Sequence, residues 1–189
     1  AYLTMALGAG SVTPLQMASV IGTVANDGVS IKPRLVQAVM NRTTGERAEF
    51  PPTVRGKVAV KPATIALIKA ALADVVTKGT ATRAKSSLVT IGGKTGTAQT
   101  AALRTGPEKD IPKKFRDHAW FVAFAPVDAP RIAVAVLAEH MGHGGSAAAP
   151  LAKDVIEAYV KTYPQVLQGV PAGGRAKSPA VPVDARPKT

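Results

Sequence analysis

The sequence has no cysteine, which excludes disulfide bonds, thiolate metal sites and a cysteine nucleophile. Aromatic residues make up only 4% of it and the basic residues are spread along its length, so it lacks the interleaved aromatic and basic residues of single-strand nucleic-acid binders. It also lacks an apolar run of about 18 residues, and its amino terminus has no basic segment followed by a hydrophobic one. The sequence therefore predicts neither a membrane span nor a signal peptide within these residues.

What is present is a hydrophobic content of 46% in 189 residues, which is enough for the core of one domain or of part of one. The net charge of +12 suits a nucleic acid, an anionic membrane or an acidic polymer as partner, and the charge alone does not choose among them. Because the first residue is Ala1 and not methionine, we expect the chain to begin inside a larger protein.

Helices are expected where apolar residues recur at helical spacing between hydroxyl, proline or glycine boundaries. They run from Thr13-Pro14 to residue 26, from Pro62 to residue 78, and from a Ser146 cap to the residue before Pro164. We expect residues 1–163 to form part of one domain. Residues 164–189 are rich in proline, alanine and basic residues, so a disordered tail is predicted there.

Strands are expected over residues 31–41, 88–99, 118–126 and 131–139. The first returns through a turn at 43–46 as a hairpin, and the last two are almost continuously apolar, which is typical of strands covered on both faces. The predicted fold class is therefore α+β, a mainly antiparallel sheet with helices on both faces. The polar segment 100–117 is long enough for a functional loop that overhangs the mouth of a site, and its charges fit a solvated surface equally well.

The segment Ile91-Gly-Gly-Lys-Thr-Gly-Thr-Ala-Gln99 places a cation among hydroxyls and bare backbone at the end of a β-branched run. A lysine, a hydroxyl residue and a glycine occur in that order by chance in roughly one chain in ten of this length. A phosphate-binding loop also ends in Gly-Lys-Thr, but it requires glycine where this chain has Leu88, and a helix directly after the threonine. A third reading is the Lys-Thr-Gly strand of serine acyl enzymes that act on D-alanyl peptides.

Separated blocks of the sequence, agreeing in order and spacing, resemble class B penicillin-binding proteins. The blocks are Gly10-Ser-Val-Thr-Pro-Leu-Gln-Met-Ala18, Lys94-Thr-Gly-Thr-Ala-Gln99, His118-Ala-Trp-Phe121 with Phe124-Ala-Pro126, and Gly142-His-Gly-Gly-Ser-Ala-Ala-Ala-Pro150. The resemblance covers roughly residues 1 to 163, and within the family it is greatest to the elongation-type enzymes of the penicillin-binding protein 2 group. It implies part of the fold shared by these transpeptidases and the serine β-lactamases.

The resemblance also implies a chemistry: attack on a D-alanyl-D-alanine bond, release of D-alanine, and transfer of the acyl group to an amine of a neighbouring stem peptide. Lys94 and the backbone N–H of Thr97 would be catalytic, in the proton network and the oxyanion hole respectively. Thr95, Gly96 and Thr97 would bind the substrate, with the two hydroxyls on its terminal carboxylate. β-Lactams would enter as substrate mimics, and no cofactor is implied.

The family also needs a serine followed three residues later by lysine, and a Ser-x-Asn motif. No serine in this sequence meets either condition. We therefore expect the carboxy-terminal half of a transpeptidase domain, inactive alone, whose amino-terminal half completes it at the periplasmic face of the inner membrane. A glycosyltransferase and the elongation complex are possible partners, and nucleic acid is not expected. The alternative that stays open is a non-catalytic basic module that binds peptidoglycan or nucleic acid.

The histidines and aromatic residues receive structural expectations. His118, His140 and His143 follow no helix-borne metal-ligand spacing, so structural or loop roles are favoured and no metal is expected. Trp120 and Phe121 lie in an apolar run and are expected in the core.

Overall fold

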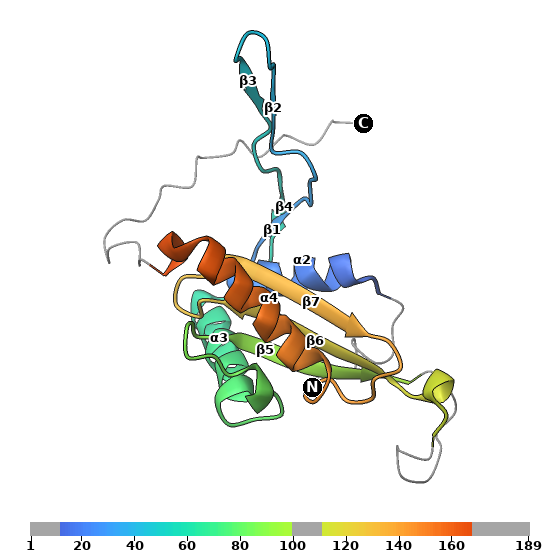
Figure 1. The fold of residues 1–189 in the computed structure, drawn as a ribbon. Helices are drawn as coiled ribbons and strands as arrows, with labels where there is room; N and C mark the ends of the chain where they lie inside the picture. The colour runs from blue at the N-terminus through green and yellow to red at the C-terminus, as the bar shows by residue number, and fades with distance from the viewer. Residues whose placement is uncertain (1–11, 100–110, 168–189) are drawn as a thin grey trace, which may run out of the picture.

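A computed structural model describes residues 12–99 and 111–167 of the chain. Its centre is an antiparallel sheet of the order β5-β6-β7, formed by Gly92–Ala98, His118–Ala125 and Ile132–Ala138 (Figure 1). β6 is the middle strand and is buried from Ala119 to Ala125, which confirms the prediction that its two faces are both covered. The strands expected near 118–126 and 131–139 are thus correct to within a residue or so.

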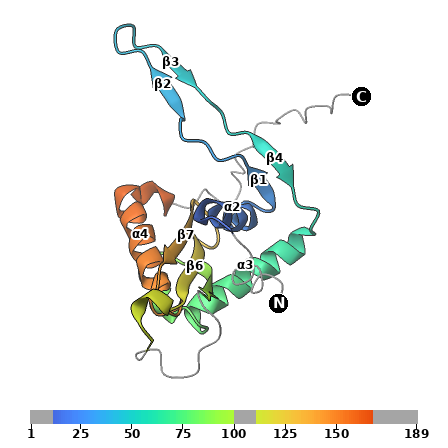
Figure 2. The same cartoon turned by 90° about the vertical axis from the view of Figure 1, so that its right-hand side faces the viewer.

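Helices cover the sheet on both faces, as predicted (Figures 1 and 2). One face packs against α4 (Ala148–Thr162), whose buried Ile156 lies in one cluster with Phe121 of β6. The other face packs against α2 (Pro14–Ala25), whose buried Ile21 shares a second cluster with Phe124. Successive β6 side chains alternate between the two clusters because side chains of a strand point to opposite faces. The helix α3 (Pro62–Thr77) packs beside β5 and contributes Leu72 to the α2 side.

The ends of α2 are those that the sequence predicts. The hydroxyl of Thr13 accepts a hydrogen bond from the Gln16 backbone N–H at 3.2 Å, and the Gln16 side chain accepts one from the Thr13 N–H at 2.7 Å. This reciprocal pair satisfies two N–H groups that would otherwise have no partner. After the helix the chain turns through Asp27 and Gly28 with φ of 53° and 84°, a region that glycine adopts without strain.

The expectation that Ser146 caps the last helix is wrong. The residue before α4 is Ala147, which makes no side-chain cap, and the Ser146 hydroxyl instead donates to the carbonyl of His143 at 3.0 Å. The Gly144 carbonyl instead accepts hydrogen bonds from two N–H groups of the first turn of α4, those of Ala148 and Ala149, at 3.1 and 2.9 Å. The cap prediction from Ser146 fails because a backbone carbonyl, and not the serine side chain, accepts these hydrogen bonds.

The strand expected over 31–41 does not join the main sheet. Its ends pair instead with the returning chain, β1 (Val29–Ile31) with β4 (Val54–Lys57) and β2 (Ala38–Met40) with β3 (Arg47–Glu49). These two ribbons form an arm that extends away from the body (Figure 2). Pro33 and the pair at 51–52 cannot donate to a ladder, which explains why pairing stops between the ribbons. The expected hairpin is confirmed, but its position in the sheet is not.

The Lys-Thr-Gly strand begins later than predicted, at Gly92 instead of residue 88, and Val89 and Ile91 before it pack into the α4 cluster. Short 3-10 turns complete the described part: η1 (Thr82–Ala84), η3 (Lys113–Phe115) and η4 (Pro164–Val166). Of the predicted tail, η4 is described and Val166 packs against the core, whereas 168–189 lies outside the described residues. The same holds for residues 1–11 and for 100–110 of the predicted loop. No helix in the described ranges is both long and apolar enough to cross a bilayer.

Candidate active-site cleft

β5 presents the Lys-Thr-Gly residues at an edge of the main sheet, since within the described residues it pairs with β6 alone. Its first residues must be glycine for steric reasons. A Cβ at Gly93 would lie 2.5 Å from a ring carbon of Phe121 and 2.6 Å from the carbonyl oxygen of Val122, both closer than real Cβ contacts. The glycines therefore let β5 lie flat against the aromatic residues of β6, which fixes the strand that follows.

Thr95 and Thr97 line a cleft of about 500 Å³ together with Thr80, Arg83, His143, Gly145 and Ser146. These residues come from β5, from the turn after α3 with η1, and from the loop between β7 and α4. The structure thus brings together two of the predicted site residues with segments that are distant in sequence. The volume is within the range of ligand sites, about 300 to 1,000 Å³.

Direct contacts hold the walls of this cleft in place. The hydroxyls of Thr80 and Thr95 share a hydrogen bond of 2.9 Å, and the Arg83 guanidinium donates to the Ser146 carbonyl at 3.1 Å. A Cβ on Gly145 would collide with the Thr80 carbonyl oxygen, and one on Gly144 would collide with the Trp120 carbonyl oxygen. The loop before α4 therefore lies directly against both β5–β6 and the turn after α3.

Lys94 does not line the cleft. Its register partner on β6 is Val122, which belongs to the α2 side, whereas the partner of Thr95 is Phe121 on the α4 side. Neighbouring side chains of a strand point to opposite faces, so Lys94 leaves β5 on the other side from the threonines. Lys94 is half-buried as a residue, and its ammonium donates to the Thr95 carbonyl at 2.9 Å. Its catalytic role, like the substrate roles of Thr95, Gly96 and Thr97, stays a prediction.

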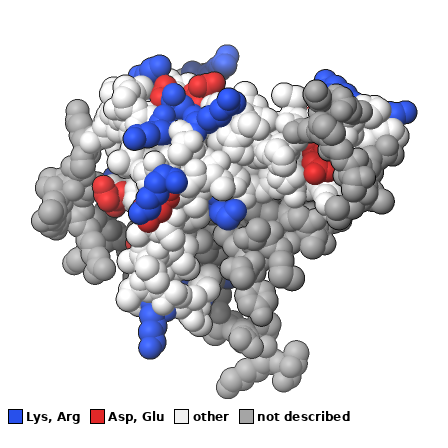
Figure 3. Space-filling model, turned by 90° about the horizontal axis from the view of Figure 1, so that it is seen from below, with Lys and Arg blue, Asp and Glu red and all other residues white. Residues whose placement is uncertain are grey.

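The lining of the cleft carries positive but no acidic side chains. Arg83 is its permanent cation, and neither aspartate nor glutamate is among the lining residues. On the face of the molecule that Figure 3 shows, several Lys and Arg side chains gather at the upper left with Asp and Glu beside them, and others lie singly on uncharged surface.

The histidines occupy structural positions. The ring of His118 accepts a hydrogen bond from the His140 backbone N–H at 2.9 Å, and the two rings meet edge to face at 4.6 Å between centroids. This contact joins the start of β6 to His140, the second residue after β7, which has a φ of 57°. His143 lies in the cleft lining instead. In the described ranges no group of three or more His, Asp or Glu is arranged to hold a metal ion.

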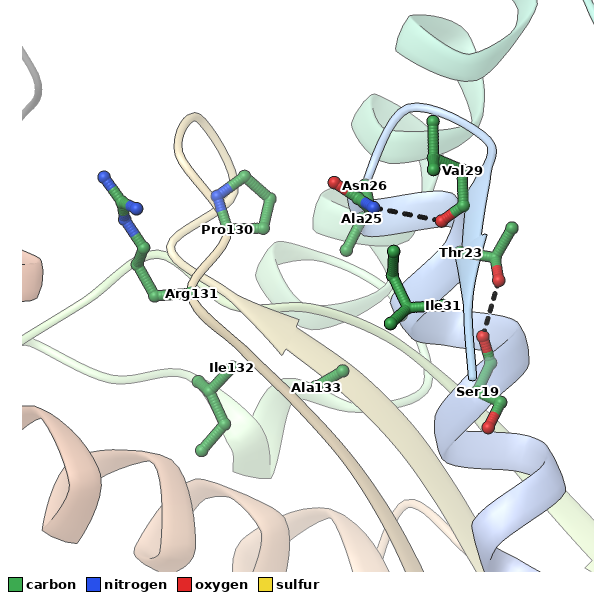
Figure 4. Close-up of a pocket in the computed structure, with 11 residues that line it drawn as sticks. Ser19, Thr23, Ala25, Asn26, Val29, Ile31, Pro130, Arg131, Ile132 and Ala133 are labelled. Carbon is green, nitrogen blue, oxygen red and sulfur yellow. Dashed lines mark hydrogen bonds between the residues drawn. The ribbon is translucent and has the colours of Figure 1, made fainter. Parts of the chain in front are cut away.

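A second hollow of about 300 Å³ lies between α2, β1 and the turn from β6 to β7 (Figure 4). Two of its polar side chains are already used: the Thr23 hydroxyl donates to the Ser19 carbonyl at 2.7 Å, and the Asn26 amide donates to the Val29 carbonyl at 3.0 Å. The hollow lies beside Ile132, the first residue of β7. Thr97 of the cleft pairs through Ala119 with the other end of β7, at Ala138. None of the predicted site residues reaches it, so it is separate from the cleft.

Sequence reasoning missed Thr80 and Arg83. Thr80 bonds to Thr95, which is 15 residues away in the sequence, and Arg83 bonds to Ser146, which is 63 residues away. The local sequence pattern does not indicate such pairs. The block at 142–150 carries part of the family resemblance, but its sequence does not indicate that it forms a wall of the cleft.

Fold and cleft together define a class of protein: an α+β domain in which a Lys-Thr-Gly strand forms the edge of an antiparallel sheet and one wall of a ligand cleft. The family model of the penicillin binding protein transpeptidase domain matches residues 1–157. The chain therefore belongs to the penicillin-binding protein transpeptidase domain family.

Individual relatives agree with this assignment. The peptidoglycan D,D-transpeptidase MrdA of Acinetobacter baumannii is 38% identical over 164 residues, which are 82% of this chain and 23% of that protein. Penicillin-binding protein 2B of Streptococcus pneumoniae is 34% identical over 175 residues, which are 86% of this chain and 25% of that protein. The chain thus spans about a quarter of the length of these curated relatives.

Solved structures show the same likeness. The D,D-transpeptidase domain of a peptidoglycan glycosyltransferase from Eggerthella lenta matches with a TM-score of 0.66 and 32% identity, over 80% of this chain and 32% of that one. The penicillin G acyl-enzyme complex of penicillin-binding protein A from Mycobacterium tuberculosis matches with a TM-score of 0.63 and 32% identity, over 79% and 32%. The sequence-based family and fold class are confirmed.

Proposed function

We propose that this chain forms the Lys-Thr-Gly wall of the active site of a peptidoglycan D,D-transpeptidase that works through a serine acyl-enzyme. The observation that carries the proposal is the acid-free cleft in which Thr95 and Thr97 lie side by side on a Lys-Thr-Gly strand. The nucleophile comes from a segment outside these residues, because no serine here has a lysine three residues later. Below, the complete protein means this chain joined to that segment.

The reaction begins when the serine oxygen attacks the carbonyl carbon between the two D-alanines of a stem peptide. The C–N bond then breaks, the terminal D-alanine leaves with a proton on its amine, and an ester links the stem peptide to the serine. An amine of a neighbouring stem peptide attacks this ester, forms the cross-linking amide and releases the serine with its proton. Nothing is oxidised or reduced, so these steps need no electron donor or acceptor.

This chain contributes binding and charge stabilisation. The hydroxyls of Thr95 and Thr97 bind the terminal carboxylate of the substrate, and the Thr80 hydroxyl orients that of Thr95. The Thr97 backbone N–H is one donor of the oxyanion hole, and such a donor is typically worth about 2.7 to 4 kcal/mol of transition-state stabilisation. The Lys94 ammonium faces the other side of β5, where it joins the proton network of the serine segment.

The setting of this reaction is part of the proposal. One relative is named as a peptidoglycan D,D-transpeptidase, which supports a location at the periplasmic face of the inner membrane. There the complete protein would work in the elongation complex that maintains cell shape, beside a glycosyltransferase that supplies the glycan strands. Protease accessibility in spheroplasts tests the location, since a domain that stays protected there contradicts it.

D-alanine release tests the activity. The complete protein, given an acetylated peptide that ends in D-alanyl-D-alanine, should release D-alanine and should be labelled by fluorescent penicillin. The 189-residue chain alone should form no adduct, because none of its serines has an activating lysine in the motif position. A complete protein that neither releases D-alanine nor is labelled contradicts the proposal, and salt-sensitive binding to DNA or peptidoglycan would then favour a basic binding module.

A further inference from the structure

The Arg83 side chain is a feature of the cleft that the proposed chemistry does not use. It comes from η1, and its guanidinium donates to the Ser146 carbonyl at 3.1 Å. None of the ion pairs in the described part of the chain includes it, and the cleft lining has no carboxylate that could pair with it. Its charge is therefore not neutralised by a described acidic residue.

The guanidinium is also positioned to bind a further group. It has five N–H donors in a planar fork, and the Ser146 carbonyl accepts a hydrogen bond from one of its terminal nitrogens, so donors are left for a ligand. The bond to Ser146 restrains the side chain, which reduces the entropy that binding would cost. A restrained guanidinium in an acid-free cleft is suited to a carboxylate, which it can bind through two parallel hydrogen bonds.

Arg83 and the two threonines come from different walls of one cleft, so they offer an anionic ligand separate positions. We propose that Arg83 binds a second carboxylate of the substrate, one on a side chain of the stem peptide, while Thr95 and Thr97 bind the terminal one. The inference rests on the proposed function and adds a specificity to it: the enzyme prefers stem peptides that carry a side-chain carboxylate over peptides in which that group is an amide.

A simpler role for Arg83 is to fasten the loop before α4 through Ser146. That role would affect every substrate alike, because the loop position is the same for all of them. A preference between two peptides that differ only in one carboxylate is therefore the readout that separates the roles. If Arg83 bound the terminal carboxylate instead, its loss would likewise slow both peptides by the same factor.

The test uses two acetylated peptides that end in D-alanyl-D-alanine and have, at the preceding residue, either a side-chain carboxylate or its carboxamide. For the complete protein we expect kcat/KM of D-alanine release to be about tenfold higher for the peptide with the carboxylate than for the carboxamide. Tenfold is the lower end of the effect of a hydrogen bond to a charged group, because Arg83 is exposed. Arg83→Gln should remove that preference, and Arg83→Lys should keep part of it because the charge stays while the fork is lost.

Lys85→Gln is the matched control, since this exposed cation lies two residues away and does not line the cleft. It should keep the tenfold preference. Thermal unfolding of each variant checks that it is folded. The inference is overturned if wild type shows no preference, if Arg83→Gln keeps it, or if Lys85→Gln loses it as well. Absence of both D-alanine release and penicillin labelling in wild type would instead refute the proposed function.

Discussion

Replacing Gly144 by alanine perturbs the contact that joins the loop before α4 to the sheet. A Cβ built there would collide with the Trp120 carbonyl oxygen and would lie 2.6 Å from the carbonyl oxygen and 3.0 Å from the nitrogen of Gly96. All three atoms belong to the backbone of β5 and β6, so no side-chain rotation can relieve the clash. Either the loop must move away from the sheet, or the two strands must separate.

The expected cost is that of overpacking, typically about 1 to 3 kcal/mol. Gly144 also accepts the first hydrogen bonds of α4, from Ala148 and Ala149, so a shift of the loop strains that helix start as well. The matched control is Gly56→Ala in the arm, where a Cβ would meet nothing within 4 Å. The control should stay within about 1 kcal/mol of wild type, on the stabilising side if anything, because alanine reduces the entropy of the unfolded chain.

Thermal unfolding of the complete protein measures the first effect, and the rate of acylation by fluorescent penicillin measures the second. A loss of 1 kcal/mol lowers Tm by about 2 to 4 °C in a domain of 150 to 250 residues. The Tm of Gly144→Ala should therefore be several degrees lower than that of Gly56→Ala. Gly144→Ala should also be acylated more slowly, because its cleft is opened. Equal Tm and equal acylation rates for the two variants would refute the reasoning.

Further substitutions test other contacts. Thr80→Val removes the partner of the Thr95 hydroxyl and should slow penicillin acylation by up to about tenfold. The free energy of unfolding should stay within about 0.5 kcal/mol of wild type. An unchanged acylation rate would contradict the orienting role of Thr80. Ile156→Ala, at 0% exposure, should cost about 2 to 5 kcal/mol in denaturant unfolding, and Leu151→Ala on the same helix, at 48% exposure, much less. Thr13→Ala removes the capping box of α2 and should cost about 1 kcal/mol by the same measurement, so a stability equal to wild type would argue against the cap.

The helices and the central strands were predictable because their signals are local. Thr13-Pro14 marks the start of α2, and the almost continuous apolar run of β6 indicates a strand between two layers. The Lys-Thr-Gly strand was predictable as well, although Val89 and Ile91 belong to the core before the strand begins. These features depend on residues that lie close together in the sequence.

The arm and the cleft walls were not predictable because they depend on distant partners. The segment at 31–41 has the composition of a strand, but composition does not say that it pairs with the returning chain and stays off the main sheet. Ser146 matches the sequence pattern of a helix cap, but its hydroxyl donates to the chain before it. The Gly144 carbonyl accepts the hydrogen bonds at the start of α4 instead. Arg83 reaches the cleft only because η1 and the loop before α4 meet in the folded chain.

The central claim is that the Lys-Thr-Gly strand serves an acylating serine. It is tested most directly by the rate at which fluorescent penicillin acylates the complete protein carrying Lys94→Ala, with Lys78→Ala as control. Lys78 is a surface lysine whose side chain is 73% exposed and pairs with Asp74 at 3.2 Å, so its loss should leave the rate unchanged. Lys94→Ala should slow acylation about 100-fold, the lower end of what a group that assists proton transfer typically contributes. An unchanged rate in a folded Lys94→Ala protein would contradict the claim and would leave the strand as a structural edge with a half-buried lysine.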